Sequence, residues 1–140
     1  MKKISIITSK KYLKSKNYES LIKILKSNDI EYEIINIDEN IDLMISNSNL
    51  ILSVGGDGTA LRAMKIAWLS KLPVLNIGSG RIGYLVNSLN DIDFNKIIKD
   101  KNLDNNKKRT PIIQNQNEKL PAFNEICLLY TSDAADEHSC

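Results

Sequence analysis

The sequence predicts an α/β protein with a doubly wound, largely parallel sheet. Short β-branched apolar runs alternate with segments whose apolar residues recur at helical spacing, and this alternation is typical of parallel sheets with helices on both faces. One run, "NLILSV" (49–54), is almost continuously apolar, as expected of a central strand that is covered on both sides.

The first third of the chain is expected to form two strands and two helices. "KISIIT" (3–8) is β-branched and apolar, which predicts a strand. Apolar residues at helical spacing in 18–28 predict an amphipathic helix. "EYEIINI" (31–37) alternates in its first half and predicts the second strand, and a short helix is assigned to 42–48.

The middle of the chain continues the alternation. The central strand 49–54 leads through a glycine turn into a helix over 58–70, whose apolar residues supply a buried side. "PVLNI" (73–77) predicts the fourth strand, and a further helix is expected over 94–101. After Thr110 the pattern changes to "PIIQNQNEKLPAFNEI", two strand-like stretches around a polar turn.

This change of pattern predicts three segments. Residues 1–110 are expected to form an α/β domain, and residues 111–126 are expected to begin a β-rich second domain that is cut short. Residues 127–140, "CLLYTSDAADEHSC", lack the Ile, Lys and Asn that crowd the chain before them. From Cys127 to Glu137 this tail resembles a translated sequencing-library adapter and is interpreted as non-native, although a flexible polar terminus is the alternative.

Composition excludes several classes of function. The 140 residues are 42% hydrophobic and 26% charged, and the net charge of +2 is too small to favour nucleic acid or an anionic membrane as a partner. No apolar stretch approaches the roughly 18 residues of a membrane helix, so a cytoplasmic location is expected. Cys127, His138 and Cys140 match no structural zinc pattern, and no metal ligands are assigned.

The string "LSVGGDGTALRAM" (52–64) carries the main candidate site. It joins the central strand to the following helix, and ligands of open α/β sheets bind at the carboxyl ends of strands. Glycines let backbone N–H groups and the helix N-terminus face an anion, and a threonine hydroxyl adds a donor. The candidate residues for binding phosphates are therefore Gly55, Gly56, Gly58 and Thr59.

Asp57 lies inside this turn, and two roles are open to it. Aspartate is a favoured N-cap of a helix. Alternatively, a carboxylate beside phosphates deprotonates a substrate hydroxyl for attack on a phosphoryl group, with metal ions balancing the charge. No G-x-x-x-x-G-K-[ST] string occurs, so the second role predicts a small-molecule kinase without a P-loop.

Three motifs together resemble the NAD kinase family. "GGDGTALRAMK" is similar to the family signature, "PVLNIGSGRIGYLVN" to its second glycine segment and "AFNEI" to its third motif, in the family's order between Ile4 and Ile126. Lipid kinases and phosphofructokinases share a GGDG-type turn, but lipid kinases typically place a polar Asn or Glu soon after it. The alternatives are such a kinase or a non-catalytic nucleotide-binding module.

The resemblance implies a reaction and its participants. Members transfer the γ-phosphoryl group of ATP to the 2′-hydroxyl of the NAD adenosine ribose with a divalent metal such as Mg²⁺. The full-length protein is then expected to be a homo-oligomer that binds NAD and ATP. Because the β-rich domain that completes the NAD site in the family is largely missing here, the 140-residue chain is expected to be inactive.

The resemblance also implies roles for individual residues. Asp57 corresponds to the proton acceptor, Gly58 to a neighbouring nucleotide contact, and Arg62 to a basic contact. Asn124 and Glu125 correspond to the pair that holds adenine and ribose groups of NAD. An amide can recognise adenine and a carboxylate can accept hydrogen bonds from ribose hydroxyls, so the chemistry agrees.

The second glycine segment invites a different interpretation, which the sequence disfavours. "GSGRIG" satisfies the dinucleotide fingerprint G-x-G-x-x-G, but "YLVN" after it predicts extended chain rather than a helix.

Tyr84 corresponds to an aromatic position near the NAD site, with packing in the core as its alternative. The family usually has Gly-Ile-Asn where this chain has Asn76-Ile77-Gly78, which puts any contact of that family Asn in doubt.

Overall fold

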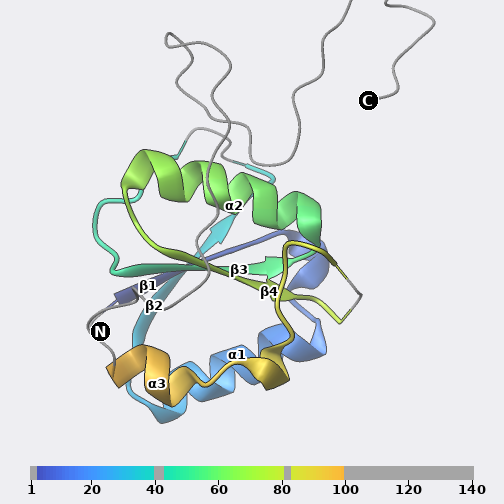
Figure 1. Cartoon of the computed structure of the whole chain (residues 1–140), viewed down its shortest axis with the longest axis vertical. Coiled ribbons are helices and arrows are strands. Elements are labelled where there is room, and N and C mark those ends of the chain that lie inside the picture. The colour runs from blue at the N-terminus through green and yellow to red at the C-terminus, as the bar shows by residue number, and fades with distance from the viewer. Residues whose placement is uncertain (1–2, 40–42, 81–82, 100–140) are drawn as a thin grey trace, which may run out of the picture. The chain divides into compact units, whose positions relative to one another are not determined.

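A four-stranded parallel sheet forms the centre of the fold, with the strand order β2-β1-β3-β4 (Figure 1). The computed structural model describes residues 3–39, 43–80 and 83–99. The strands are β1 (Lys3–Thr8), β2 (Glu31–Asn36), β3 (Leu50–Gly55) and β4 (Val74–Gly78). The predicted α/β fold class is confirmed, and each of the four predicted strands is present within one residue of its expected bounds.

Helices cover both faces of the sheet. Figure 1 shows α2 on one face and α1 and α3 on the other. The helices are α1 (Lys16–Ser27), α2 (Asp57–Ser70) and α3 (Phe94–Lys99), with short 3-10 helices η1 (Lys10–Tyr12) and η2 (Leu89–Asp91). The α1 helix begins after Ser15, whose hydroxyl accepts a hydrogen bond from the Tyr18 N–H. In the described part of the chain, no helix is long and apolar enough to cross a membrane.

The two faces of the sheet bury two separate apolar clusters. Successive residues of a strand point to opposite faces, so β3 sends Leu50, Leu52 and Val54 toward α1 and Ile51 toward α2. The α1 helix contributes Leu21 and Leu25 to the first cluster, and the small and branched residues Ala63, Ile66 and Ala67 of α2 form the second. The prediction that 49–54 is a central, doubly covered strand is confirmed.

The short helix predicted for 42–48 is wrong. The described residues of this segment, 43–48, are irregular. The Ile45 N–H donates to the Ser70 hydroxyl at the end of α2 (2.8 Å), and the Ile45 side chain is buried beneath that helix. Serine and asparagine in "ISNSN" favour local side-chain hydrogen bonds over a helix. The path of this segment is therefore set by the buried Ile45 side chain and its hydrogen bond to Ser70.

A buried polar cluster supports the amino end of β1. The Ser5 hydroxyl donates to the Glu33 carboxylate (2.6 Å) and lies 2.6 Å from the Ser48 hydroxyl. Because the single proton of Ser5 is used on Glu33, Ser48 donates to Ser5. Glu33 also pairs with Lys3 at 3.0 Å. These contacts tie β1, β2 and the segment before β3 together.

We expect Glu33→Gln to flatten the acid-induced loss of stability. The Ser5 hydrogen bond, with Lys3, holds the pKa of Glu33 below its ordinary value of 4.5. Its stabilisation is therefore complete above about pH 4.5 and is lost as the pH falls through the lower, folded-state pKa. Urea unfolding between about pH 3 and about pH 7 measures this. Equal pH dependence in both proteins would contradict it.

The carboxyl ends of the strands lie level at one edge of the sheet. Thr8 of β1 is in register with Asn36 of β2 and Val54 of β3, and Val54 is in register with Ile77 of β4. The Thr8 hydroxyl donates to the Val54 carbonyl (2.8 Å). The chain runs from β1 to β2 on one side and from β3 to β4 on the other. The loops after the neighbouring strands β1 and β3 therefore lead in opposite directions and flank the topological switch point, where ligands of such sheets bind.

Candidate active site

The glycine turn between β3 and α2 is closed tightly over its own helix. A Cβ on Gly55 would lie 2.5 Å from the Thr59 hydroxyl oxygen, closer than any side chain tolerates. Thr59 is correspondingly buried against Gly55. The N-terminus of α2 can therefore face the carboxyl edge of the sheet with only glycine backbone in front of it. The expected strand–turn–helix context of the motif is present.

Asp57 is not the N-cap of α2. The helix begins at Asp57 itself, and Gly56 occupies the N-cap position without a side-chain cap. The half-buried Asp57 carboxylate instead accepts two backbone hydrogen bonds, from the Tyr84 N–H (3.1 Å) and the Leu85 N–H (3.0 Å). One bond ends on each carboxylate oxygen, so the two amides fix the orientation of the whole group. Asp57 thus joins the first glycine segment to the second.

Gly83 makes this approach possible. A Cβ at this position would lie 2.6 Å from Oδ1 of Asp57 and 2.7 Å from Cγ2 of Val86. Both distances are below any that a real Cβ shows, so only glycine lets the segment come this close to the carboxylate. The third glycine of the second segment is therefore explained by its contact with Asp57 rather than by a dinucleotide.

The second segment opens no helix. Residues 83–88 are irregular, and Asn87 forms an isolated parallel bridge to Ile77. The Gly78 N–H donates to the Asn87 carbonyl (2.9 Å), and the Asn87 N–H donates to the Asn76 carbonyl (2.8 Å). The extended chain predicted for "YLVN" is found only at Asn87, because Tyr84 and Leu85 lie in a bend. Since no helix begins here, the dinucleotide fingerprint fails in its structural context.

Further hydrogen bonds hold the loops of this edge together. The Ser79 N–H donates to the Gly55 carbonyl (3.0 Å), which joins the turns after β3 and β4. Asn17, from the first turn of α1, donates its side-chain amide to the Gly78 carbonyl (2.6 Å). Asn76, which stands where the family usually has Gly, has a structural role here. Its side chain is buried and accepts a hydrogen bond from the Ser53 hydroxyl (2.7 Å). It supports the sheet from within.

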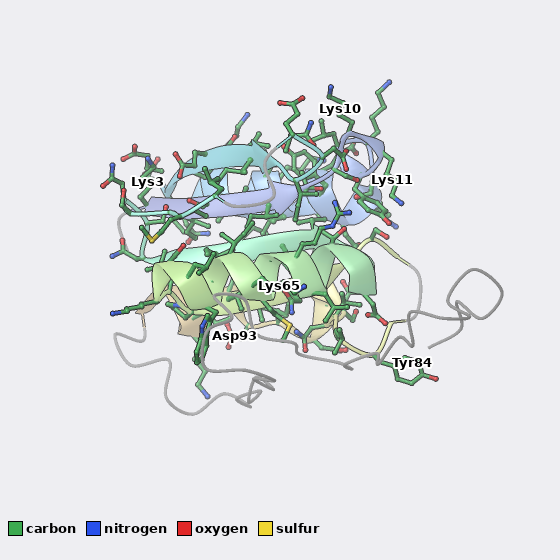
Figure 2. The ribbon with its side chains drawn as sticks, turned by 90° about the horizontal axis from the view of Figure 1, so that it is seen from above. Lys3, Lys10, Lys11, Lys65, Tyr84 and Asp93 are labelled. Carbon is green, nitrogen blue, oxygen red and sulfur yellow. The ribbon has the colours of Figure 1, made fainter. Side chains whose placement is uncertain are left out.

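The other predicted site residues divide into three groups. Gly58 and Arg62 are exposed on α2, and Arg62 lies about 7.5 Å further along the helix axis than Asp57. Tyr84 is 92% exposed and projects away from the sheet (Figure 2), so the alternative that it packs in the core is wrong. Asn124 and Glu125, like the predicted segments 111–126 and 127–140, lie outside the described residues.

Sequence reasoning missed residues that follow β1. A Cβ on Gly56 would lie 3.6 Å from the Tyr12 hydroxyl, so η1 reaches the glycine turn. The Lys11 ammonium lies 4.7 Å from the centre of the Tyr12 ring and brings a cation to the same edge. The signal for Tyr12 was its place just after a strand, but only the strand order shows that this strand is the neighbour of β3.

Within the described residues, no three acidic, cysteine or histidine side chains gather closely enough to hold a metal ion. The carboxylate at the glycine turn is that of Asp57. A single carboxylate suits Mg²⁺, which binds through one or two carboxylates together with substrate phosphates and waters. A metal that enters with a phosphorylated nucleotide therefore fits the groups present.

The fold and the glycine turn together indicate a class of protein. An open parallel sheet whose central strand ends in a glycine turn and a helix N-terminus is typical of α/β domains that bind phosphorylated ligands. A family model, the ATP-NAD kinase N-terminal domain, matches residues 3–104. The chain belongs to the NAD kinase family, and the matched part includes Asp57, Arg62 and Tyr84.

Curated relatives agree with the family match. The chain is similar to an NAD kinase of Ruminiclostridium cellulolyticum, with 34% identity over 95 residues that cover 61% of this chain and 33% of the relative. An NAD kinase of Methanosphaera stadtmanae is 33% identical over 76 residues, 48% of this chain and 28% of the relative. An NAD kinase of Caldicellulosiruptor bescii is 35% identical over 80 residues, which cover 57% of this chain and 29% of the relative. These matches span about a third of each relative's length.

Proposed function

We propose that the protein containing this chain is an NAD kinase, which transfers the γ-phosphoryl group of ATP to the 2′-hydroxyl of the NAD adenosine ribose. The observation that carries the proposal is the Asp57 carboxylate, held at the glycine turn by the Tyr84 and Leu85 amides. A carboxylate fixed by the protein beside a phosphate-binding turn is the arrangement that general-base catalysis of phosphoryl transfer requires.

The proposed step forms one phosphorus–oxygen bond and breaks another. Asp57 accepts the proton of the ribose 2′-hydroxyl while the 2′-oxygen attacks the γ-phosphorus of ATP. The bond from the γ-phosphorus to the β–γ bridging oxygen breaks, and ADP leaves. Each carboxylate oxygen has a second lone-pair position, so Asp57 can accept the hydroxyl proton without releasing Tyr84 or Leu85. Mg²⁺ bound with ATP offsets the charge of the phosphates.

Other groups would bind and orient the two substrates. The backbone N–H groups of Gly56 and Gly58 and the α2 N-terminus face the phosphates, and the Arg62 guanidinium adds a cation. By the family resemblance, Asn124 and Glu125 hold adenine and ribose groups of NAD. The exposed Tyr84 ring offers a surface on which NAD can lie. A cytoplasmic location and homo-oligomeric assembly of the full-length protein belong to the same proposal.

Arg62→Ala and Glu125→Ala test the binding half of this proposal in the full-length protein. Each removes a charged partner from a substrate that is largely desolvated when bound, so we expect NAD affinity to fall by about 10- to 100-fold. Calorimetric titration of NAD measures it. Lys26→Ala, which removes an exposed cation from the last turn of α1 at the opposite edge of the sheet, is the matched control. Unchanged affinity in both variants would contradict the assignment.

The short chain provides a further test. Because it spans only about a third of the length of its relatives, we expect the 140-residue protein to form no measurable NADP from NAD and ATP. Groups held without their supporting domain lose most of their orienting effect. Detection of NADP above that formed by the same chain with Asp57→Asn would contradict this expectation.

A further inference from the structure

A pocket of about 240 Å³ opens at the carboxyl ends of β1 and β2, next to the glycine turn's own strand. Its apolar wall is formed by Leu13 and Ile34, two large side chains that are 37% and 49% exposed. Its polar wall includes Ser9 and Lys10, which directly follow β1, and Glu39, which lies three residues after the end of β2. None of these residues has a role in the proposed chemistry at Asp57.

The buried hydroxyl of Ser9 lines the pocket and lacks a hydrogen-bond partner among the described residues. The residue is only 6% exposed, and its hydroxyl has no hydrogen-bond partner in the described part of the chain. Ser9 occupies the N-cap position of η1, where a serine hydroxyl usually bonds to the helix, yet it makes no capping bond. Buried hydroxyls are rarely left unsatisfied, because the lost hydration is costly. A ligand in the pocket would supply the missing partner.

Glu39 presents a second unused polar atom. Lys10 lies 3.1 Å and the Asn36 amide 2.9 Å from the same oxygen, Oε1. These two contacts hold the pKa of Glu39 below its usual range, so the group is ionised at neutral pH and acts purely as an acceptor. Among the described residues, no partner is found for Oε2. The Glu39 side chain is 60% exposed, so its carboxylate is open to accept hydrogen bonds from a pair of neighbouring hydroxyls.

The pocket and the glycine turn face the same edge of the sheet. Thr8 lines the pocket and donates to the Val54 carbonyl, one residue before Gly55. From β2 to β3 is two strand spacings, or about 10 Å. Between them η1 carries Lys10 and Lys11, which lie together at this end of the sheet, whereas Lys3 lies at the other end (Figure 2). A phosphate chain can therefore run past two lysines from the pocket to the turn.

We propose that this pocket binds the nucleoside of the phosphoryl donor, with the ribose hydroxyls on Glu39 and Ser9 and the base against Leu13 and Ile34. This assignment rests on the proposed kinase function and specifies where the donor binds. The volume of about 240 Å³ lies just below the range of about 300–1,000 Å³ that is usual for small-molecule pockets, so the pocket has room for part of a nucleotide rather than for the whole of it. The donor phosphates then extend along η1 to Asp57's turn, and the acceptor lies elsewhere.

Ser9→Ala gives the sharpest test. Calorimetric titration of Mg-ADP into the 140-residue chain is expected to show an affinity about 3- to 10-fold lower, the value of one neutral hydrogen bond. The unliganded chain is expected to melt at a higher temperature, because an unsatisfied buried hydroxyl has been removed. A merely structural serine would not weaken binding while raising stability. Ser46→Ala, at an exposed serine outside the pocket, is the control.

Ile34→Gln tests the apolar wall without adding charge. The residue is half exposed on the edge strand β2, so the fold is expected to tolerate the change. ADP affinity is expected to fall about 3- to 10-fold, while the affinity for inorganic triphosphate stays the same. An equal loss for both ligands, or ADP affinity unchanged in this variant and in Ser9→Ala, would overturn the assignment.

Two further outcomes separate this proposal from the proposed function. If these variants weaken binding of NAD but not of ADP, or if the chain does not bind ADP, the pocket does not take the donor and the inference is overturned. The assay of Asp57 variants for NADP formation is independent of that result. Conversely, ADP binding that depends on Ser9 and Ile34 supports the pocket even if the full-length protein forms no NADP, which would refute the kinase proposal alone.

Discussion

Asp57→Asn in the full-length protein is expected to lower the turnover number for NADP formation by about 10²- to 10⁴-fold. An amide cannot accept the proton of the 2′-hydroxyl, whereas the substrates still meet the same turn, the same helix N-terminus and the same cations. The Michaelis constants for NAD and ATP are therefore expected to change much less than the turnover number. Steady-state kinetics with each substrate varied in turn measures both.

The structure sharpens the interpretation of this substitution. The carboxylate uses one oxygen for the Tyr84 N–H and the other for the Leu85 N–H. An asparagine has a single acceptor oxygen and places an NH₂ group against the remaining amide. We therefore expect a stability loss of about 1–2 kcal/mol in addition to the catalytic loss. Urea unfolding of the 140-residue chain measures that part separately.

A matched control distinguishes chemistry from local disturbance. Asp91→Asn changes an exposed carboxylate in η2, outside the glycine turn, and is expected to leave turnover unchanged. Turnover of the Asp57→Asn variant within about threefold of the original would be incompatible with a general base and would reduce Asp57 to a structural link between the glycine segments. A rise in the Michaelis constants alone would assign it to binding.

The strands could be predicted because consecutive apolar side chains mark a strand that is buried on both faces. β3 sends Leu52 to one face and Ile51 to the other, so an almost continuous apolar run has one interpretation. The 42–48 segment was misassigned because its path depends on Ile45 and its bond to Ser70, residues distant in sequence. Local pattern carries no record of such a tether.

The candidate site was predicted only in part, for a related reason. The glycine turn and Asp57 are contiguous in sequence and belong to a recognisable string. The contributions of Ser9, Tyr12 and Asn17 depend on β1 lying between β2 and β3, and strand order is set by tertiary packing. Likewise, the sequence could not show that Gly83 lies against Asp57, because α2 and β4 lie between the two residues in the chain.

Gly83→Ala is expected to be the most damaging change that leaves every proposed site side chain intact. Its Cβ would lie 2.6 Å from Oδ1 of Asp57, so the carboxylate or the 83–85 segment must move, and the bonds to Tyr84 and Leu85 are disturbed. A displacement of about 1 Å in a catalytic group costs about 10²-fold in rate. We expect a fall in turnover of about 10- to 100-fold, with a loss of stability of about 1–3 kcal/mol.

A second substitution separates the positioning of Asp57 from simple overpacking. The Gly83 Cβ would also lie 2.7 Å from Cγ2 of Val86, so Val86→Ala in the same chain relieves that contact but not the one with Asp57. The double variant is expected to regain part of the stability in urea unfolding and none of the turnover. As a contrast, Gly58→Ala meets no described atom within 4 Å and is expected to raise stability, because alanine is the better helix former by about 1 kcal/mol. If turnover returned together with stability in the double variant, Gly83 would serve packing alone, and the position of the Asp57 carboxylate would not depend on the small size of residue 83.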